Sequence, residues 1–218
     1  MIVARYSAID GGRTAHKVAR MWGGAILLGS GIRVRVRGAS NLDPSRPCIY
    51  MSNHQSNFDI PVLVSCLKVQ FRWLAKKELF RIPLFGHAMK QSGSISVDRS
   101  NRRAAFESLK QTAQTIKNGV SVVIFPEGTR STDGYIRDFK KGGFVLAAEA
   151  GVPIVPVILH GTRAIMPKKQ ISITPGDVLM EIRSPIETSI YGRKDKNMLM
   201  EKVRAIVCES FEEGKIRN

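Results

Sequence analysis

The chain has 218 residues, of which 43% are hydrophobic, and this length and composition fit one globular domain with a substantial buried core. Lys and Arg number 34 against 18 Asp and Glu, so the net charge of +16 predicts an anionic partner: nucleic acid, an acidic membrane surface or a phosphorylated substrate. Three widely spaced cysteines exclude a disulfide framework and a zinc CxxC pattern, which indicates a reducing location on the cytosolic side.

The first 31 residues are predicted to form an N-terminal segment ahead of a domain at residues 32–218. Within this segment Ala15 to Leu28 reads as a helix with apolar residues and Trp22 on one side and basic residues on the other. Such a helix could lie in a membrane interface, or it could pack on the domain, and the sequence leaves both open. The apolar run from Met21 to Ile32 is too short for a membrane span of about twenty residues. A cleavable signal peptide is not expected, because basic residues are spread through the first twenty positions and no small-residue cleavage site follows the run.

From residue 32 onward, strand patterns alternate with helix patterns. Ile32 to Arg37 alternates strictly between apolar residues and arginines, as a half-exposed strand does. Further strands are expected at 48–52, 71–75, 94–97, 120–125, 154–159, 170–173 and 178–183, and helices at 60–67, 76–90 with a break at Pro83, 102–118, 144–150 and 197–211. This order predicts a single-domain α/β sandwich around a mixed, largely parallel sheet.

A histidine and an acid stand five positions apart in the run Asn53 to Asp59, directly after the predicted strand at 48–52. An imidazole held by a carboxylate can take a proton from a hydroxyl near neutral pH. Asp59 would also open the next helix, near its positive end. The run therefore points to an enzyme with His54 and Asp59 at its centre.

A second cluster, Phe125 to Ser131, begins where the predicted strand at 120–125 ends, and ligand sites gather at strand ends in α/β folds. Gly128 lets the backbone approach a ligand, and Arg130 offers a planar fork that matches a phosphate or carboxylate. Another strand ends in an arginine within Gly93 to Arg99, and the run Val152 to Val157 follows further along the chain.

Taken in order, these four runs resemble the conserved blocks of the glycerolipid acyltransferase family, specifically the 1-acylglycerol-3-phosphate (lysophosphatidate) acyltransferases. Those blocks are NHxxxxD, G-x-I-x-x-D/S-R, FPEGTRS and V-P-[IV]-[IV]-P, and the resemblance runs from roughly Ile32 to Leu159. It implies that His54 acts as general base on the free sn-2 hydroxyl of the lysolipid and that Asp59 orients the imidazole. The oxygen would attack the thioester of acyl-CoA or acyl-carrier protein, with no covalent acyl-enzyme, cofactor or metal.

The resemblance also implies which residues bind the substrate. Arg130 should bind the substrate phosphate, with Arg99 as a second contact. Lys76 or Lys77 matches a basic position of relatives. The other expected substrate-binding residues are Glu127, Gly128 and Thr129. Glu127 either hydrogen-bonds the substrate or holds the loop, and the loop role is favoured; backbone N–H groups near Gly128 could stabilise the oxyanion. Pro153 and Pro156 are expected to shape a sheet edge or the floor of an acyl-chain channel.

The predicted protein is a peripheral enzyme on the cytoplasmic face of the membrane that makes phosphatidic acid from lysophosphatidic acid. Its expected partners are an anionic membrane surface and acyl-CoA or acyl-carrier protein. The alternatives are an acyltransferase for another lysolipid or lyso-aminolipid, a basic nucleic-acid-binding module, and a non-catalytic lipid-binding protein. Nucleic acid is disfavoured as a partner because no recognisable binding motif occurs and only 7% of residues are aromatic.

Overall fold

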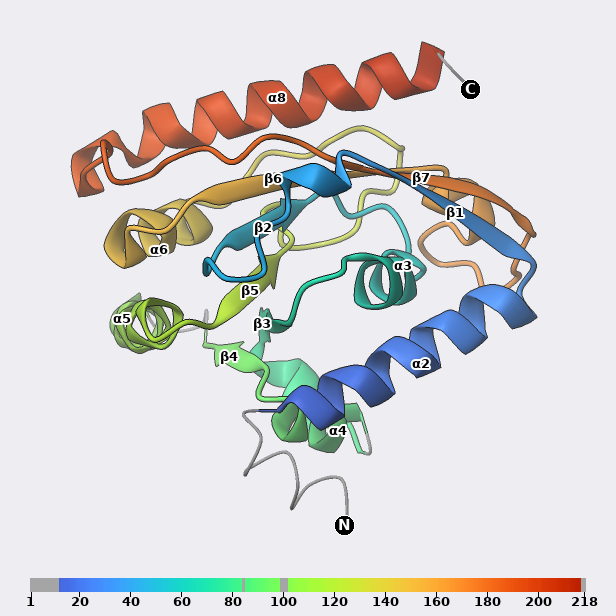
Figure 1. Ribbon diagram of the computed structural model, residues 1–218, viewed down its shortest axis with the longest axis horizontal. Coiled ribbons are helices and arrows are strands. Elements are labelled where there is room, and N and C mark those ends of the chain that lie inside the picture. The colour runs from blue at the N-terminus through green and yellow to red at the C-terminus, as the bar shows by residue number, and fades with distance from the viewer. Residues whose placement is uncertain (1–11, 84, 99–101, 217–218) are drawn as a thin grey trace.

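A mixed β-sheet forms the centre of the computed structural model, which describes residues 12–83, 85–98 and 102–216. Within these residues the sheet has seven strands in the order β1-β7-β6-β2-β5-β3-β4 (Figure 1). The strands are β1 (Ile32–Arg37), β2 (Ile49–Ser52), β3 (Phe71–Lys76), β4 (Ile95–Val97), β5 (Ser121–Ile124), β6 (Ile154–His160) and β7 (Gly176–Ile182). Neighbouring strands are parallel except β6 and β7, which confirms the predicted mixed, largely parallel α/β fold.

Helices cover the sheet on two sides. They are α2 (Arg13–Gly29), α3 (Asp59–Cys66), α4 (Phe85–Gln91), α5 (Arg102–Lys117), α6 (Gly142–Ala150), α7 (Thr162–Ile165) and α8 (Lys196–Ile216), with short 3-10 turns η1 (Ala39–Asn41), η2 (Lys77–Arg81) and η3 (Arg193–Asp195). Residues of α2 and α3 pack into one core with one face of the sheet, and residues of α5, α6 and α8 pack into a second core with the other face (Figure 1).

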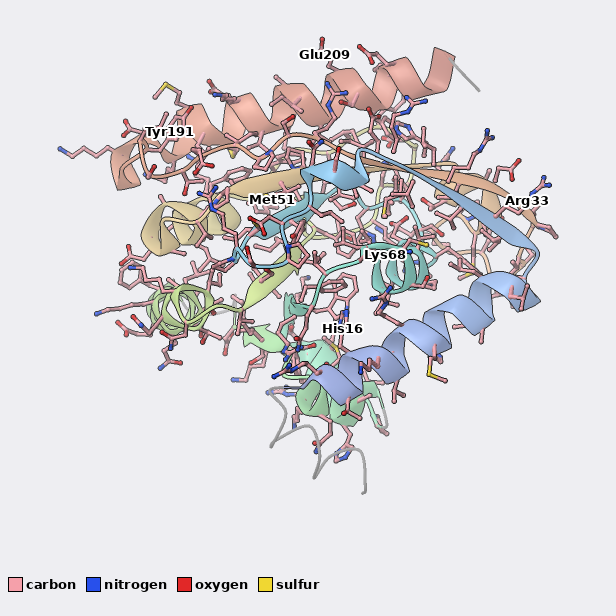
Figure 2. The ribbon with its side chains drawn as sticks, viewed as in Figure 1. His16, Arg33, Met51, Lys68, Tyr191 and Glu209 are labelled. Carbon is pink, nitrogen blue, oxygen red and sulfur yellow. The ribbon has the colours of Figure 1, made fainter. Side chains whose placement is uncertain are left out.

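The central strands explain this two-layer arrangement. All four residues of β2 are buried; Tyr50 belongs to the core under α3, whereas its neighbours Ile49 and Met51 belong to the core under α8. Successive side chains of a strand point to opposite faces, so a strand buried on both faces needs an unbroken apolar run. Figure 2 shows Met51 inside the molecule, while Arg33 and Glu209 point outward from β1 and α8.

The helix expected at 15–28 is α2, and it packs against α3 (Figure 1). Gly23 allows the close approach, because a Cβ at that position would lie 2.6 Å from a methyl carbon of Val64. Ala15, Gly23 and Leu27 are buried on this side, and the opposite side remains open to solvent. The division of the chain at residue 31 stays a prediction, and residues 1–11 lie outside the described part.

One predicted strand, and one of the two roles predicted for Pro156, are wrong. Residues 170–173 form a loop, because the parallel ladder of β1 with β7 starts only at Gly176, opposite Ile32, and the preceding residues extend beyond it. Pro156 lies in an interior strand and not at an edge. Proline has no N–H to donate to a neighbouring strand, but the carbonyl of Pro156 accepts the N–H of Arg183 at 2.9 Å. The other role expected of Pro153 and Pro156, the floor of an acyl-chain channel, stays a prediction.

Candidate active site

Three of the four sequence runs that suggested chemistry meet at one edge of the sheet, whereas the run Val152 to Val157 leads into the start of β6 at the opposite edge. Strands β2, β5, β3 and β4 are parallel neighbours, so their carboxyl ends lie together. His54 follows β2, Glu127 follows β5, Lys76 ends β3 and Asp98 follows β4. Ligand sites in open α/β sheets form at this edge, because loops rather than ladder bonds continue each strand there.

A histidine and a buried carboxylate form the core of the site. His54 Nδ1 lies 2.7 Å from Asp59 Oδ2, and the same oxygen accepts the backbone N–H groups of Gln55 at 2.7 Å and Ser56 at 2.9 Å. Asp59 is the first residue of α3 and is fully buried. An ionised carboxylate only accepts hydrogen bonds, so the proton of the neutral imidazole sits on Nδ1 and the lone pair is on Nε2.

The backbone of His54 is fixed from both sides. Its N–H donates to Glu127 Oε1 at 2.7 Å, and its carbonyl accepts the N–H of Ser131 at 2.9 Å. The ring stacks on Phe125 with a centroid distance of 3.9 Å. These contacts leave the imidazole few rotamers, which suits a base that must meet a substrate hydroxyl in one orientation.

Asn53 anchors the end of β2 to β6. Its side chain donates to the carbonyl of Leu159 at 2.9 Å and accepts the N–H of Leu159 at 2.8 Å. The buried amide thus replaces the backbone pairing that a further strand residue would make, and it places His54 at the point where β2 ends.

Glu127 is a buried acid that joins two loops. Its Oε2 accepts the N–H of Arg137 at 2.9 Å, while Oε1 accepts that of His54. Burial raises the pKa of Glu127 to about 7, against the lowering effect of these two N–H donors. Both oxygens are therefore engaged with backbone groups that position the loops.

The stretch after Glu127 turns sharply beside His54. Gly128 has φ 74°, a conformation that favours glycine, and its N–H donates to the carbonyl of Phe125 at 3.0 Å. This N–H is therefore occupied within its own turn and does not point at a substrate. Thr129 is exposed and Arg130 is half-buried; within the described part of the chain the Arg130 guanidinium makes no hydrogen bond or ion pair.

A lysine that sequence reasoning did not single out supports this stretch. Lys168 Nζ lies 2.9 Å from the carbonyl oxygen of Arg130 and 3.3 Å from Thr129 Oγ1. No motif surrounds Lys168, so the sequence carries no signal for this role. Asn53, Phe125 and Ser131 were also not assigned roles, although each stands inside a run that was recognised.

The remaining expected substrate contacts differ in their surroundings. Lys76 and Lys77 are both exposed at the end of β3, and Lys77 forms an ion pair with Asp98 at 3.0 Å. Arg99 lies outside the described residues. In the described ranges, no three His, Cys, Asp or Glu side chains come together as metal ligands do, and the expectation that no metal takes part stays a prediction.

A histidine and carboxylate at the carboxyl ends of parallel strands form an arrangement suited to acid–base chemistry on a bound hydroxyl. Residues 33–160 match the family described as Acyltransferase. This match covers more than half of the chain, and the protein therefore belongs to the acyltransferase family.

Similar proteins carry a more specific name. The chloroplastic 1-acyl-sn-glycerol-3-phosphate acyltransferase BAT2 of Brassica napus is 40% identical over 90% of this chain and 56% of its own. The human 1-acyl-sn-glycerol-3-phosphate acyltransferase alpha is 35% identical over 84% of this chain and 65% of its own. The crystal structure of the 1-acyl-sn-glycerophosphate acyltransferase PlsC from Thermotoga maritima superposes with a TM-score of 0.82 at 30% identity, covering 95% of this chain and 83% of that chain.

The chain spans 56% and 65% of the length of the two relatives from Brassica napus and human. Among the described residues, no helix is both long and apolar enough to cross a membrane.

Proposed function

We propose that the protein transfers an acyl group from an acyl thioester to the free sn-2 hydroxyl of 1-acylglycerol-3-phosphate, giving phosphatidic acid. The observation that carries this proposal is the hydrogen bond from His54 Nδ1 to buried Asp59. With the proton on Nδ1, the lone pair of Nε2 is available to accept a proton from the substrate hydroxyl. The names of the similar proteins from Brassica napus, human and Thermotoga maritima support the choice of acceptor.

In this mechanism His54 Nε2 removes the proton of the sn-2 hydroxyl as its oxygen attacks the thioester carbonyl. The tetrahedral intermediate then collapses, the carbon–sulfur bond breaks, and the imidazolium returns the proton to the departing thiolate. Asp59 stabilises the positive charge that forms on the ring, at a distance of 2.7 Å. Acyl-CoA and acyl-carrier protein both supply such a thioester, and either is compatible with this sequence of steps.

Arg130 is the proposed phosphate contact. Its backbone is held by Lys168, and the next residue, Ser131, bonds to the backbone of His54, so Arg130 stands beside the base. An unpaired guanidinium presents two parallel N–H donors to a phosphate. Arg99, Lys76 and Lys77 remain proposed secondary contacts.

The open side of α2 is the proposed contact with an anionic membrane surface, from which the enzyme would take its acceptor. Exposed apolar side chains recur along this side at spacings of three and four residues: Val18, Met21, Trp22, Ala25 and Leu28. Lys17 is exposed next to this stripe. An apolar stripe flanked by cations is the pattern of a helix that lies in a membrane interface.

A direct assay tests the reaction. Purified protein is given lysophosphatidate or a panel of other lysolipids, with labelled acyl-CoA and labelled acyl-carrier protein in parallel. His54→Ala should lower turnover by at least about a hundredfold while leaving folding intact. Normal turnover in the purified variant would contradict the mechanism, and a preference for another lysolipid would contradict the acceptor.

The phosphate contact is tested by Arg130→Ala. Loss of a charged hydrogen-bonding group should raise the acceptor KM about tenfold to a hundredfold. Arg33→Ala removes the same charge from an exposed site on edge strand β1, where Arg33 pairs with Asp177, and serves as control. Equal acceptor KM values for both variants would argue against a role for Arg130.

A further inference from the structure

The loop between α7 and β7, residues 166–175, exposes two isoleucines. Its base is closed by the N–H of Thr174, which donates to the carbonyl of Ile165 at 2.9 Å, and its tip turns at Lys169, which has φ 76°. Ile171 is 94% exposed and Ile173 is 48% exposed. Single exposed apolar residues are common, but two within three positions of one compact loop form an apolar patch, and contiguous apolar patches mark interaction sites.

This patch continues the open side of α2. A groove of about 460 Å³ is lined by Trp22 and Ile26 of α2, by Phe58 and Pro61 at the start of α3, and by Ile173 of the loop. The loop also meets the end of α2, because a Cβ at Gly31 would lie 3.2 Å from Pro175. Helix and loop therefore present one continuous apolar surface.

Exposed lysines lie beside this apolar surface both on loop 166–175 and on α2. Lys169 is exposed at the loop tip, and Lys17 is exposed on α2. A partner that covers this surface must combine apolar area with negative charge. It must also be wide enough to contact α2 and loop 166–175 at the same time. The surface of an anionic lipid bilayer has both properties.

We propose that loop 166–175 is a second element, beside α2, that inserts into an anionic lipid surface. This inference rests on the proposed membrane function. It adds a site that determines how the catalytic edge faces the lipid, because two contacts fix an orientation that one helix alone leaves free to roll.

The loop is also bonded to both catalytic loops. Ser56 Oγ donates to the carbonyl of Met166 at 2.8 Å, and Ser56 forms a β-bridge with Pro167. On its other side, Lys168 donates to the carbonyl of Arg130 at 2.9 Å. Insertion of Ile171 and Ile173 would thus hold the His54 and Arg130 loops at the level of the lipid headgroups.

The test uses the full chain and vesicles of equal parts phosphatidylcholine and phosphatidylglycerol. The double variant Ile171→Ser/Ile173→Ser should bind these vesicles about tenfold more weakly or worse, since each isoleucine loses apolar area that would be buried in lipid. Its turnover should fall with vesicle-embedded lysophosphatidate and stay near normal with a short-chain, monomeric lysophosphatidate. The matched control is Ile190→Ser, which removes an isoleucine that is 75% exposed; its neighbour Tyr191 lies at the end of the molecule away from α2 (Figure 2).

A second variant measures insertion directly. The indole of Ile171→Trp should shift its emission to shorter wavelengths and be quenched by brominated lipid when vesicles are added. Failure of the unaltered protein to bind vesicles would overturn both the membrane proposal and this one. Binding by the unaltered protein, with equal binding by the double variant and by Ile190→Ser or with no quenching at position 171, would overturn the loop proposal alone.

Discussion

Replacing Asp59 with asparagine separates the charge of this residue from its hydrogen bonds. An amide oxygen at the position of Oδ2 can still accept from His54 Nδ1 and from the N–H groups of Gln55 and Ser56, so the loop keeps its acceptor. The variant loses the negative charge that faces the imidazolium. At an effective dielectric constant of about 20, two unit charges about 4 Å apart attract by about 4 kcal/mol.

Because about 1.4 kcal/mol corresponds to a tenfold change in rate, Asp59→Asn should lower kcat about a thousandfold. Asp59→Ala removes the acceptor as well and leaves the buried backbone N–H groups of Gln55 and Ser56 unpaired, together with Nδ1 of the His54 ring. Each unpaired donor costs about 1–3 kcal/mol, so this variant should lose a large part of a total stability of about 5–15 kcal/mol. The asparagine variant should be the more stable of the two.

The assay follows thiol release from acyl-CoA with lysophosphatidate as acceptor, corrected for the folded fraction found by circular dichroism. A kcat for Asp59→Asn within about tenfold of normal would refute the stabilisation of the imidazolium by Asp59. Equal unfolding midpoints for the asparagine and alanine variants would refute its role in holding the turn.

Three other substitutions test the buried polar groups by denaturant unfolding. Burial raises the pKa of Glu127 to about 7, so the stability that its protonated form contributes is lost as pH rises from about 4.5 to 7. Glu127→Gln should remove about 3 kcal/mol of the change in unfolding free energy over this pH range. Parallel curves of unfolding free energy against pH for the variant and the unaltered protein would contradict this prediction. Burial beside Arg72 lowers the pKa of His16 to about 4, so the stability that its neutral form contributes is lost as pH falls from about 6.5 to 4. His16→Phe should reduce the change in unfolding free energy over this pH range by about 3 kcal/mol. An unchanged slope of unfolding free energy against pH would contradict this prediction. Asn53→Ala leaves the N–H and carbonyl of Leu159 unpaired and should cost about 2–4 kcal/mol at any pH, whereas a loss under about 1 kcal/mol would show that the anchor is dispensable.

Sequence patterns predicted the local elements well wherever local periodicity decides them. The helices at 102–118 and 197–211 and the strand at 32–37 all occur within a few residues of their expected bounds. The same alternation of apolar and polar residues at 170–173 was misleading, because no neighbouring strand is available there. Alternation describes a strand only where a partner strand supplies hydrogen bonds.

By itself, the sequence determined the fold class, the family resemblance and the His54–Asp59 pair, because a strand followed by a turn and a helix start brings residues five positions apart within reach. Tertiary structure alone decided the supports of that pair. Glu127 reaches the His54 backbone across 73 residues, Asn53 reaches Leu159 across 106, and Lys168 reaches Arg130 across 38. These contacts depend on the order in which strands lie side by side, and no single segment of the chain encodes that order.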